Sequence, residues 1–181
     1  PRRRRRHHRR GRRRRGEGDV AAGVGGDPGP GVRASGPGAG LHPDALKRMK
    51  KSQKVVADIA NKDKAVYGIN TGFGALASKF IPKKDLHTLQ LNLIRSHCTG
   101  VGNPFSREIT RAIMILRANC LAHGNSGINP EFVELILDFL NEDVLPVIPE
   151  KGSVGASGDL APLAHMALCL IGEGEVNYLG K

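Results

Sequence analysis

Residues 151–165 read KGSVGASGDLAPLAH, a glycine-punctuated loop that runs directly into an apolar segment. The apolar segment, roughly Leu160 to Ile171, predicts a helix that lies deep inside a larger structure, because it has no polar face. Glycine-rich loops at helix N-termini often bind phosphate groups. However, no Lys-Ser or Lys-Thr follows these glycines, and Ser157 does not stand in a Gly-x-Ser-x-Gly motif. The segment is therefore neither a P-loop nor a hydrolase nucleophile elbow.

Upstream of this loop, apolar residues recur at helical intervals. The spacing predicts helices from Pro43 to about Asn61, over Leu86 to His97, from a Ser106 cap to Gly124, and from Asn129-Pro130 onward. In the third helix we expect one inward face with Ile109, Ile113, Leu116 and Cys120, and in the fourth Phe132, Leu135, Ile136 and Phe139. No convincing alternating strand pattern is visible, so the predicted fold class is mainly α.

The first forty residues differ from the rest in composition. They contain 12 Arg, 11 Gly and only 3 acidic residues, whereas residues 41–181 are close to neutral. Such a segment has almost nothing to bury, so we expect residues 1–40 to be a disordered basic tail and residues 41–181 to be the folded domain. An arginine run can bind nucleic acid or serve as a nuclear address. A solvated arm or a mistranslated upstream exon would have the same composition.

Cysteine content and hydropathy bear on the location of the protein. Cys98, Cys120 and Cys169 are odd in number and widely spaced, which favours a reduced, cytoplasmic protein over a disulfide scaffold. No apolar run approaches the roughly 18 residues of a membrane-spanning helix. No cysteine pair has zinc-site spacing, and we expect no metal.

Three segments of the body resemble the aromatic amino acid ammonia-lyases. They are Tyr67 to Gly74 (YGINTGFG), Ser96-His97, and above all residues 151–165. The resemblance extends from about Pro43 to Lys181, fails in the tail, and is strongest to the histidine-specific members. It implies the N-terminal part of a helical lyase fold, incomplete at residue 181, whose full-length form is a homotetramer with active sites built from several subunits.

In this family an Ala-Ser-Gly tripeptide forms the electrophile 4-methylidene-imidazol-5-one (MIO), which the resemblance assigns to Ala156, Ser157 and Gly158. The Gly158 nitrogen attacks the Ala156 carbonyl, and glycine suits this attack because it has no Cβ in the way. Ring closure releases water, and loss of the Ser157 hydroxyl leaves an electron-poor alkene to which a substrate amine adds. The simpler interpretation of Ala156 to Gly158 is a turn that starts a helix.

The resemblance also implies roles for two other segments. Tyr67 is the expected catalytic base at the head of a glycine loop that closes as a lid, shaped by Asn70 and Gly74. A phenol, with its ordinary pKa near 10, needs a positive or hydrogen-bonding environment for this role. Ser96 and His97 are the expected substrate-binding pair, and a polar pair there suits an imidazole side chain. The alternatives are an aromatic anchor for Tyr67 and a satisfied core histidine for His97.

The expected function is conversion of L-histidine to trans-urocanate and ammonia, with these 181 residues inactive alone. One alternative is a tyrosine or phenylalanine ammonia-lyase or aminomutase. A second alternative, of another class, is a non-catalytic relic whose arginine-rich tail binds nucleic acid. A salt-sensitive shift of an RNA probe that is lost on deletion of residues 1–15 would support the relic.

Overall fold

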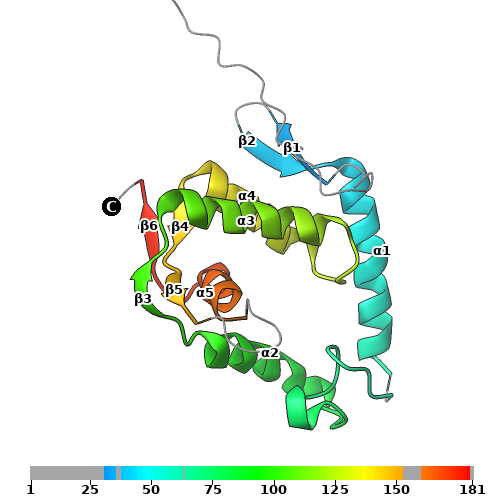
Figure 1. The fold of residues 1–181 in the computed structure, drawn as a ribbon. Coiled ribbons are helices and arrows are strands. Elements are labelled where there is room, and N and C mark those ends of the chain that lie inside the picture. Colours follow the sequence, from blue (N-terminus) through cyan, green and yellow to red (C-terminus); the bar gives the residue numbers. More distant parts are fainter. Residues whose placement is uncertain (1–30, 36–37, 63, 153–159, 180–181) are drawn as a thin grey trace, which may run out of the picture.

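The computed structural model describes residues 31–35, 38–62, 64–152 and 160–179, and these form a mainly helical structure, as predicted (Figure 1). The helices are α1 (Pro43–Ala60), α2 (Lys83–His97), α3 (Arg107–Ala122), α4 (Pro130–Asn141) and α5 (Leu160–Leu170), with a short 3₁₀ helix η1 (Gly74–Leu76). Helices α3 and α4 lie side by side, α1 crosses this pair at the C-terminal end of α3, and α5 lies against α2 (Figure 1). Among the described residues, no helix is long and apolar enough to cross a lipid bilayer.

The helices start at the residues whose chemistry favours a start. Ser106 accepts a hydrogen bond from the Ile109 N–H, and Asn129 accepts one from the Glu131 N–H. His42 caps α1 in the same way through its Nδ1, which lies 3.2 Å from the Asp44 nitrogen. Pro43 occupies the first turn of α1, where its missing N–H costs nothing. The predicted helix starts at Pro43, Ser106 and Asn129-Pro130 are therefore confirmed.

Six short strands form three antiparallel pairs that the sequence analysis did not predict. The pairs are β1 (Val32–Ser35) with β2 (Gly38–Leu41), β3 (Val101–Pro104) with β5 (Pro149–Lys151), and β4 (Val144–Pro146) with β6 (Val176–Tyr178). Each strand has three or four residues, too few for an alternating pattern to show in the sequence. The β1–β2 hairpin ends at Leu41, so all but its last residue fall within the range expected to be tail. Asn141 exchanges two hydrogen bonds with the backbone of Ala39.

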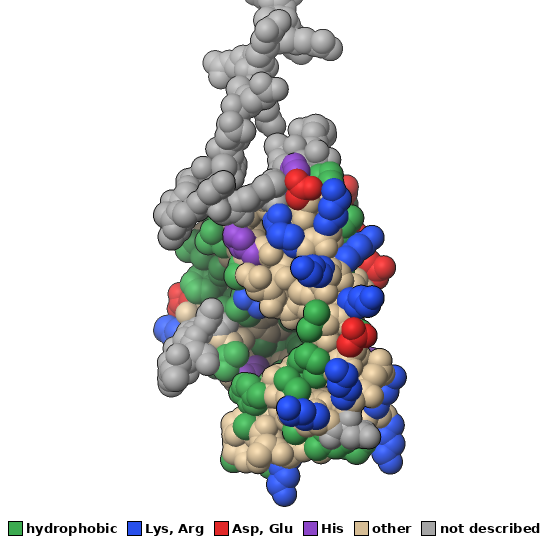
Figure 2. Space-filling model, turned by 90° about the vertical axis from the view of Figure 1, so that its right-hand side faces the viewer, with side chains coloured by type: hydrophobic (Ala, Val, Ile, Leu, Met, Phe, Trp, Pro, Cys, Tyr) green, Lys and Arg blue, Asp and Glu red, His purple; other side chains and the backbone are tan. Residues whose placement is uncertain are grey.

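The core lies between α3, α4 and the connection through β4, and it is closed by single residues from α1 and α5. Met114 and Ala118 of α3 pack against Val133, Ile136 and Leu137 of α4. Met49 from α1 and Met166 from α5 complete this cluster. The opposite face of α1 carries four exposed lysines: Lys47, Lys50, Lys51 and Lys54. Figure 2 shows many lysine and arginine side chains on this side of the molecule. Helix α1 is therefore amphipathic and packs by one side only.

The predicted inward face of α3 is wrong for most of its members. Leu116 is 68% exposed, Ile109 is 47% exposed and Cys120 is exposed, whereas Thr110, Met114 and Ala118 are buried. In α4, Phe132 is 41% exposed while Val133 lies in the core. Both helices carry apolar residues on more than one face, so spacing alone did not determine which face packs.

Met114 and Leu116 allow a matched stability test within α3, because the first side chain is buried and the second is exposed. We expect Met114→Ala to lower the free energy of unfolding by about 2–5 kcal/mol, because it leaves a cavity in the core. Leu116→Ala is expected to change it by less than about 0.5 kcal/mol, since the Leu116 side chain already contacts solvent. Urea unfolding of the 181-residue chain measures both. Equal effects of the two substitutions would contradict the packing of α3 described above.

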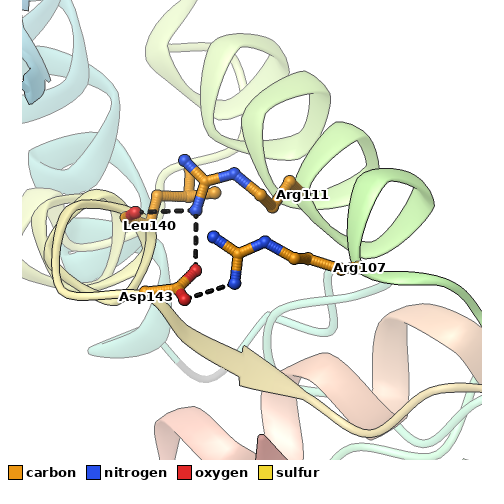
Figure 3. A network of polar contacts seen from close by, with 4 residues as sticks. All are labelled: Arg107, Arg111, Leu140 and Asp143. Atoms are coloured by element: carbon orange, nitrogen blue, oxygen red, sulfur yellow. Dashed lines mark hydrogen bonds and ion pairs between the residues drawn. The ribbon is translucent and has the colours of Figure 1, made fainter. Parts of the chain in front are cut away.

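A polar network joins the start of α3 to the end of α4 (Figure 3). The Asp143 carboxylate forms ion pairs with Arg107 and with Arg111, whose guanidinium also donates to the Leu140 carbonyl at 3.0 Å. Asp143 has a φ of +60°, the left-handed conformation that aspartate tolerates better than most residues. The hydrogen bond from Arg107 lowers the pKa of Asp143, so the carboxylate keeps its charge. The network fixes the turn from which β4 departs.

The α2–α5 pair is only partly covered within the described residues. Helix α2 has no buried residue, and its apolar residues Leu86, Leu89 and Leu93 are half-buried. In α5, Ala161, Ala164, Met166 and Cys169 are buried, whereas Leu160 is 52% exposed. An apolar helix in this situation exposes surface that soluble proteins normally cover.

Candidate functional site

Tyr67 lies in a turn between α1 and α2. Its side chain is 63% exposed, and its ring contacts Phe73 edge-on, with ring centroids 5.9 Å apart. Thr71 pairs with Phe80 in an isolated antiparallel bridge, and the Gly72 N–H donates to the Lys79 carbonyl at 3.1 Å. These two contacts join the ends of the segment from Thr71 to Phe80. Tyr67 comes before this segment in the chain.

Asn70 organises the turn that carries Tyr67. Only 1% of Asn70 is exposed, and its Oδ1 accepts a hydrogen bond of 2.7 Å from the Val66 N–H. Its Nδ2 donates to the Lys62 carbonyl at 3.3 Å and to the Lys64 carbonyl at 3.0 Å. These contacts agree with the expectation that Asn70 shapes this loop.

Ser96 and His97 lie at the C-terminal end of α2. The Ser96 hydroxyl donates to the Leu93 carbonyl at 3.0 Å, and His97 Nδ1 lies 2.8 Å from the same carbonyl oxygen. A carbonyl only accepts hydrogen bonds, so we assign the proton of a neutral His97 to Nδ1. His97 Nε2 then keeps its lone pair and can accept a hydrogen bond. Ser96 is exposed and His97 is half-buried.

Gly100, which follows α2, and Ala161, which follows the segment 153–159, both lie close to Gly152, which precedes that segment. Gly152, before that segment, lies so close to Gly100 that an added Cβ would be 2.9 Å from the Gly100 Cα. The same Cβ would be 3.0 Å from the Cβ of Ala161, which follows the segment. Gly100 in turn donates its N–H to His165 Nε2 at 3.1 Å. A side chain at position 152 would push the Gly100 backbone away, and one at position 100 would collide with the His165 ring and with Pro149.

His165 of α5 supports the segment after α2 through a hydrogen bond. Burial lowers the pKa of His165, so the ring stays neutral and its Nε2 can accept the Gly100 hydrogen bond. Gly100 follows the last residue of α2 by three positions, and its contacts with Gly152 and His165 join segments far apart in the sequence. Only proximity in the fold distinguishes this glycine from an ordinary helix-terminating one.

Ala156, Ser157 and Gly158 lie outside the described residues. The described surroundings fit a tripeptide cyclised there, because Gly152 and Ala161 meet and so hold the two ends of the intervening segment together.

The end of α2 lies close to Gly152, which precedes Ala156 by four residues in the chain, whereas the Tyr67 loop lies apart from both. His97 lies three residues before Gly100, which touches Gly152 at the start of the Ala-Ser-Gly segment. Tyr67 precedes α2, and Figure 1 shows its loop at the end of α2 that lies away from β3. Helix α2 has 15 residues and is therefore about 22 Å long. Within this chain Tyr67 does not meet His97.

The surroundings of the Ser96-His97 pair are polar on one side. Arg95 forms a two-point ion pair with Glu173, which fixes the end of α2 to the segment after α5. Burial raises the pKa of the Cys169 thiol and also that of Cys98. Both thiols are therefore neutral and serve as packing groups. In the described part of the chain, no three His, Cys, Asp or Glu side chains gather as a metal site.

Comparison with known sequences identifies relatives that align with about three quarters of the chain. The histidine ammonia-lyase of Myxococcus xanthus is 57% identical over 141 residues, which are 78% of this chain and 28% of that relative. The histidine ammonia-lyase of Bacillus subtilis is 53% identical over 138 residues, which are 76% of this chain and 27% of that relative. The chain thus spans somewhat more than a quarter of the length of these curated relatives.

Solved structures of similar proteins have the same arrangement. Histidine ammonia-lyase from Trypanosoma cruzi superposes with a TM-score of 0.71 at 43% identity, over 78% of this chain and 27% of that one. Ergothionase from Treponema denticola, an ergothioneine-degrading enzyme, gives 0.75 at 37% identity, over 78% and 28%. The family model described as aromatic amino acid lyase matches residues 32–181. Because this match covers most of the chain and the histidine ammonia-lyases above are 53% and 57% identical to it, the chain belongs to the aromatic amino acid lyase family.

Proposed function

We propose that the protein is a histidine ammonia-lyase, which converts L-histidine to trans-urocanate and ammonia. The observation that carries the proposal is identity of 57% and 55% to histidine ammonia-lyases of Myxococcus xanthus and Treponema denticola. Among the solved structures, identity is higher to the Trypanosoma cruzi histidine ammonia-lyase, at 43%, than to a Streptomyces globisporus tyrosine aminomutase, at 38%.

The Ser96-His97 pair supports an imidazole substrate. His97 Nδ1 donates to the Leu93 carbonyl, which leaves Nε2 as an acceptor. The N–H of a substrate imidazole can donate to that lone pair, and the Ser96 oxygen offers a second acceptor. An aromatic hydrocarbon ring has no such donor, so a polar pair here favours histidine over phenylalanine.

Tyr67 is proposed to remove a proton from the β-carbon of the substrate. Its exposed phenol is free to face a substrate, and its edge contact with Phe73 holds the ring from one side. His97 is the last residue of α2, whereas the Tyr67 loop precedes its first residue, so we expect the two residues to serve different active sites. This separation supports the expected homotetramer, in which different subunits contribute to each active site.

The residues that would form the MIO group are Ala156, Ser157 and Gly158. When formed, the group supplies an electrophilic alkene that turns the amino group of the substrate into a better leaving group. Gly100 and Gly152 hold the start of this segment beside the end of α2, and so beside the proposed substrate-binding pair. The chemistry needs no metal.

The proposed function is tested by offering L-histidine, L-tyrosine and L-phenylalanine separately to the purified full-length protein. We expect an aryl-acrylate absorbance only from histidine. Product from tyrosine or phenylalanine instead would favour the sister lyases, and a β-amino acid product would favour an aminomutase. The 181-residue chain, assayed alongside, is expected to form no urocanate, because it spans only 28% of the length of its relatives.

Replacing His97 tests the specificity argument directly. We expect His97→Phe to lower kcat/KM for histidine by about 10- to 100-fold, since the substrate imidazole N–H loses its acceptor at a cost of about 1–3 kcal/mol. His87→Phe is the matched control, because His87 is an exposed histidine of the same helix. Steady-state urocanate formation measures both, and an equal loss in the two variants would remove His97 from the substrate site.

A further inference from the structure

The Tyr67 turn contains one buried polar side chain in otherwise exposed surroundings. Lys62, Lys64 and Tyr67 are all exposed, whereas only 1% of Asn70 is exposed. A buried amide is costly unless its donors and acceptors are paired. Asn70 meets this requirement with three hydrogen bonds, all of them to backbone groups of residues that precede it by four to eight positions.

These bonds fix the backbone immediately before Tyr67. The Val66 N–H donates to Asn70 Oδ1 at 2.7 Å, and the Val66 carbonyl accepts the Asn70 N–H at 3.2 Å. Both backbone hydrogen-bonding groups of Val66, its N–H and its carbonyl, are thus bonded to Asn70. Because Tyr67 follows Val66 directly, the same bonds set the starting direction of the Tyr67 side chain.

The backbone of Asn70 extends the connection to α2. Its carbonyl accepts the Ile81 N–H at 2.9 Å, next to the bridge between Thr71 and Phe80. Asn70 therefore ties together the end of α1 through Lys62, the Tyr67 turn through Val66, and the approach to α2 through Ile81. The link to Ile81 spans the short 3₁₀ helix η1.

Tyr67 itself has few other supports. Among the described residues its phenol oxygen makes no hydrogen bond, and its ring has only the edge contact with Phe73. We infer that Asn70 is a positioning residue for Tyr67: its amide holds the turn from which the proposed base reaches the substrate. This inference rests on the proposed function and adds to it a residue that need not touch the substrate.

The test compares Asn70→Ala with Asn61→Ala in the full-length protein. Asn61 is a matched control, since it is an asparagine at the start of the same loop whose Oδ1 accepts an exposed hydrogen bond from Lys83. We expect Asn70→Ala to lower kcat for histidine by about a hundredfold with KM changed less than about threefold, because a displaced base costs rate more than binding. Asn61→Ala is expected to stay within about twofold of the unsubstituted protein.

Hydrogen–deuterium exchange over residues 62–72 gives a readout that does not depend on activity. Asn70→Ala is expected to speed exchange of the Val66 amide, while Asn61→Ala leaves it unchanged. Asn70→Asp keeps the acceptor for Val66 but turns oxygen atoms toward the Lys62 and Lys64 carbonyls. We therefore expect intermediate exchange and an intermediate kcat from this variant.

A folded Asn70→Ala protein with unchanged kcat, or with unchanged exchange at Val66, would overturn the inference. If Asn70→Ala does not fold, Asn70→Asp decides in the same way, with thermal unfolding as the check on folding. If the unsubstituted protein forms no urocanate, the proposed function fails, and the exchange measurement alone decides whether Asn70 holds the Tyr67 turn.

Discussion

Ser157→Ala in the full-length protein is expected to abolish urocanate formation, with a fall in kcat of at least about three orders of magnitude. The reason is chemical: alanine has no hydroxyl to lose, so the exocyclic alkene cannot form from Ala156, Ser157 and Gly158. No ordinary side chain supplies an equivalent electrophile. Initial rates with saturating histidine measure the loss.

Intact mass provides an independent check on the Ser157 prediction. Formation of the electrophile releases two water molecules, so the unsubstituted protein should be lighter than its sequence by that mass. Ser157→Ala should not show the full loss. The matched control is Ser78→Ala, because Ser78 is exposed and lies far from Ser157 in the sequence. This variant should keep both the mass loss and the activity. An active Ser157→Ala protein would contradict the proposed chemistry.

Tyr67→Phe is expected to lower kcat by about 10²- to 10⁴-fold, the range typical for loss of a general base. Phenylalanine keeps the ring that contacts Phe73 edge-on, so the turn should keep its structure. Only the phenol oxygen is lost, and with it the group proposed to accept the β-proton. Thermal unfolding should show nearly the same midpoint as for the unsubstituted protein.

Tyr178→Phe is the matched control for Tyr67→Phe. The 181 residues contain two tyrosines, and Tyr178 is also half-exposed, at 51%, but lies on β6, paired with β4. We expect its activity to stay within about twofold of the unsubstituted protein. Full activity of Tyr67→Phe would assign Tyr67 to the alternative role of an aromatic anchor for the loop.

Helix positions in this protein could be predicted from local chemistry. Caps at Ser106 and Asn129 and prolines at Pro43 and Pro130 mark helix starts through interactions within a few residues. The strands could not be predicted, because pairs such as Val101 with Lys151 join residues far apart in the sequence. The packed face of α3 could not be predicted either, since Leu116 and Met114 are equally apolar and only the position of α4 separates them.

The candidate site likewise has features that the sequence predicts and features that only the tertiary structure shows. By itself the sequence determined the family resemblance and the candidates Tyr67, Ser96, His97 and Ala156 to Gly158, because their chemistry is carried by residue type and local spacing. Only the tertiary structure decided that Gly100 lies against Gly152, that His165 accepts from Gly100, and that Tyr67 and His97 lie toward opposite ends of α2. Those relations depend on the close approach of segments that are distant in the sequence. A close backbone contact requires a glycine, but the sequence does not show which segment that glycine contacts.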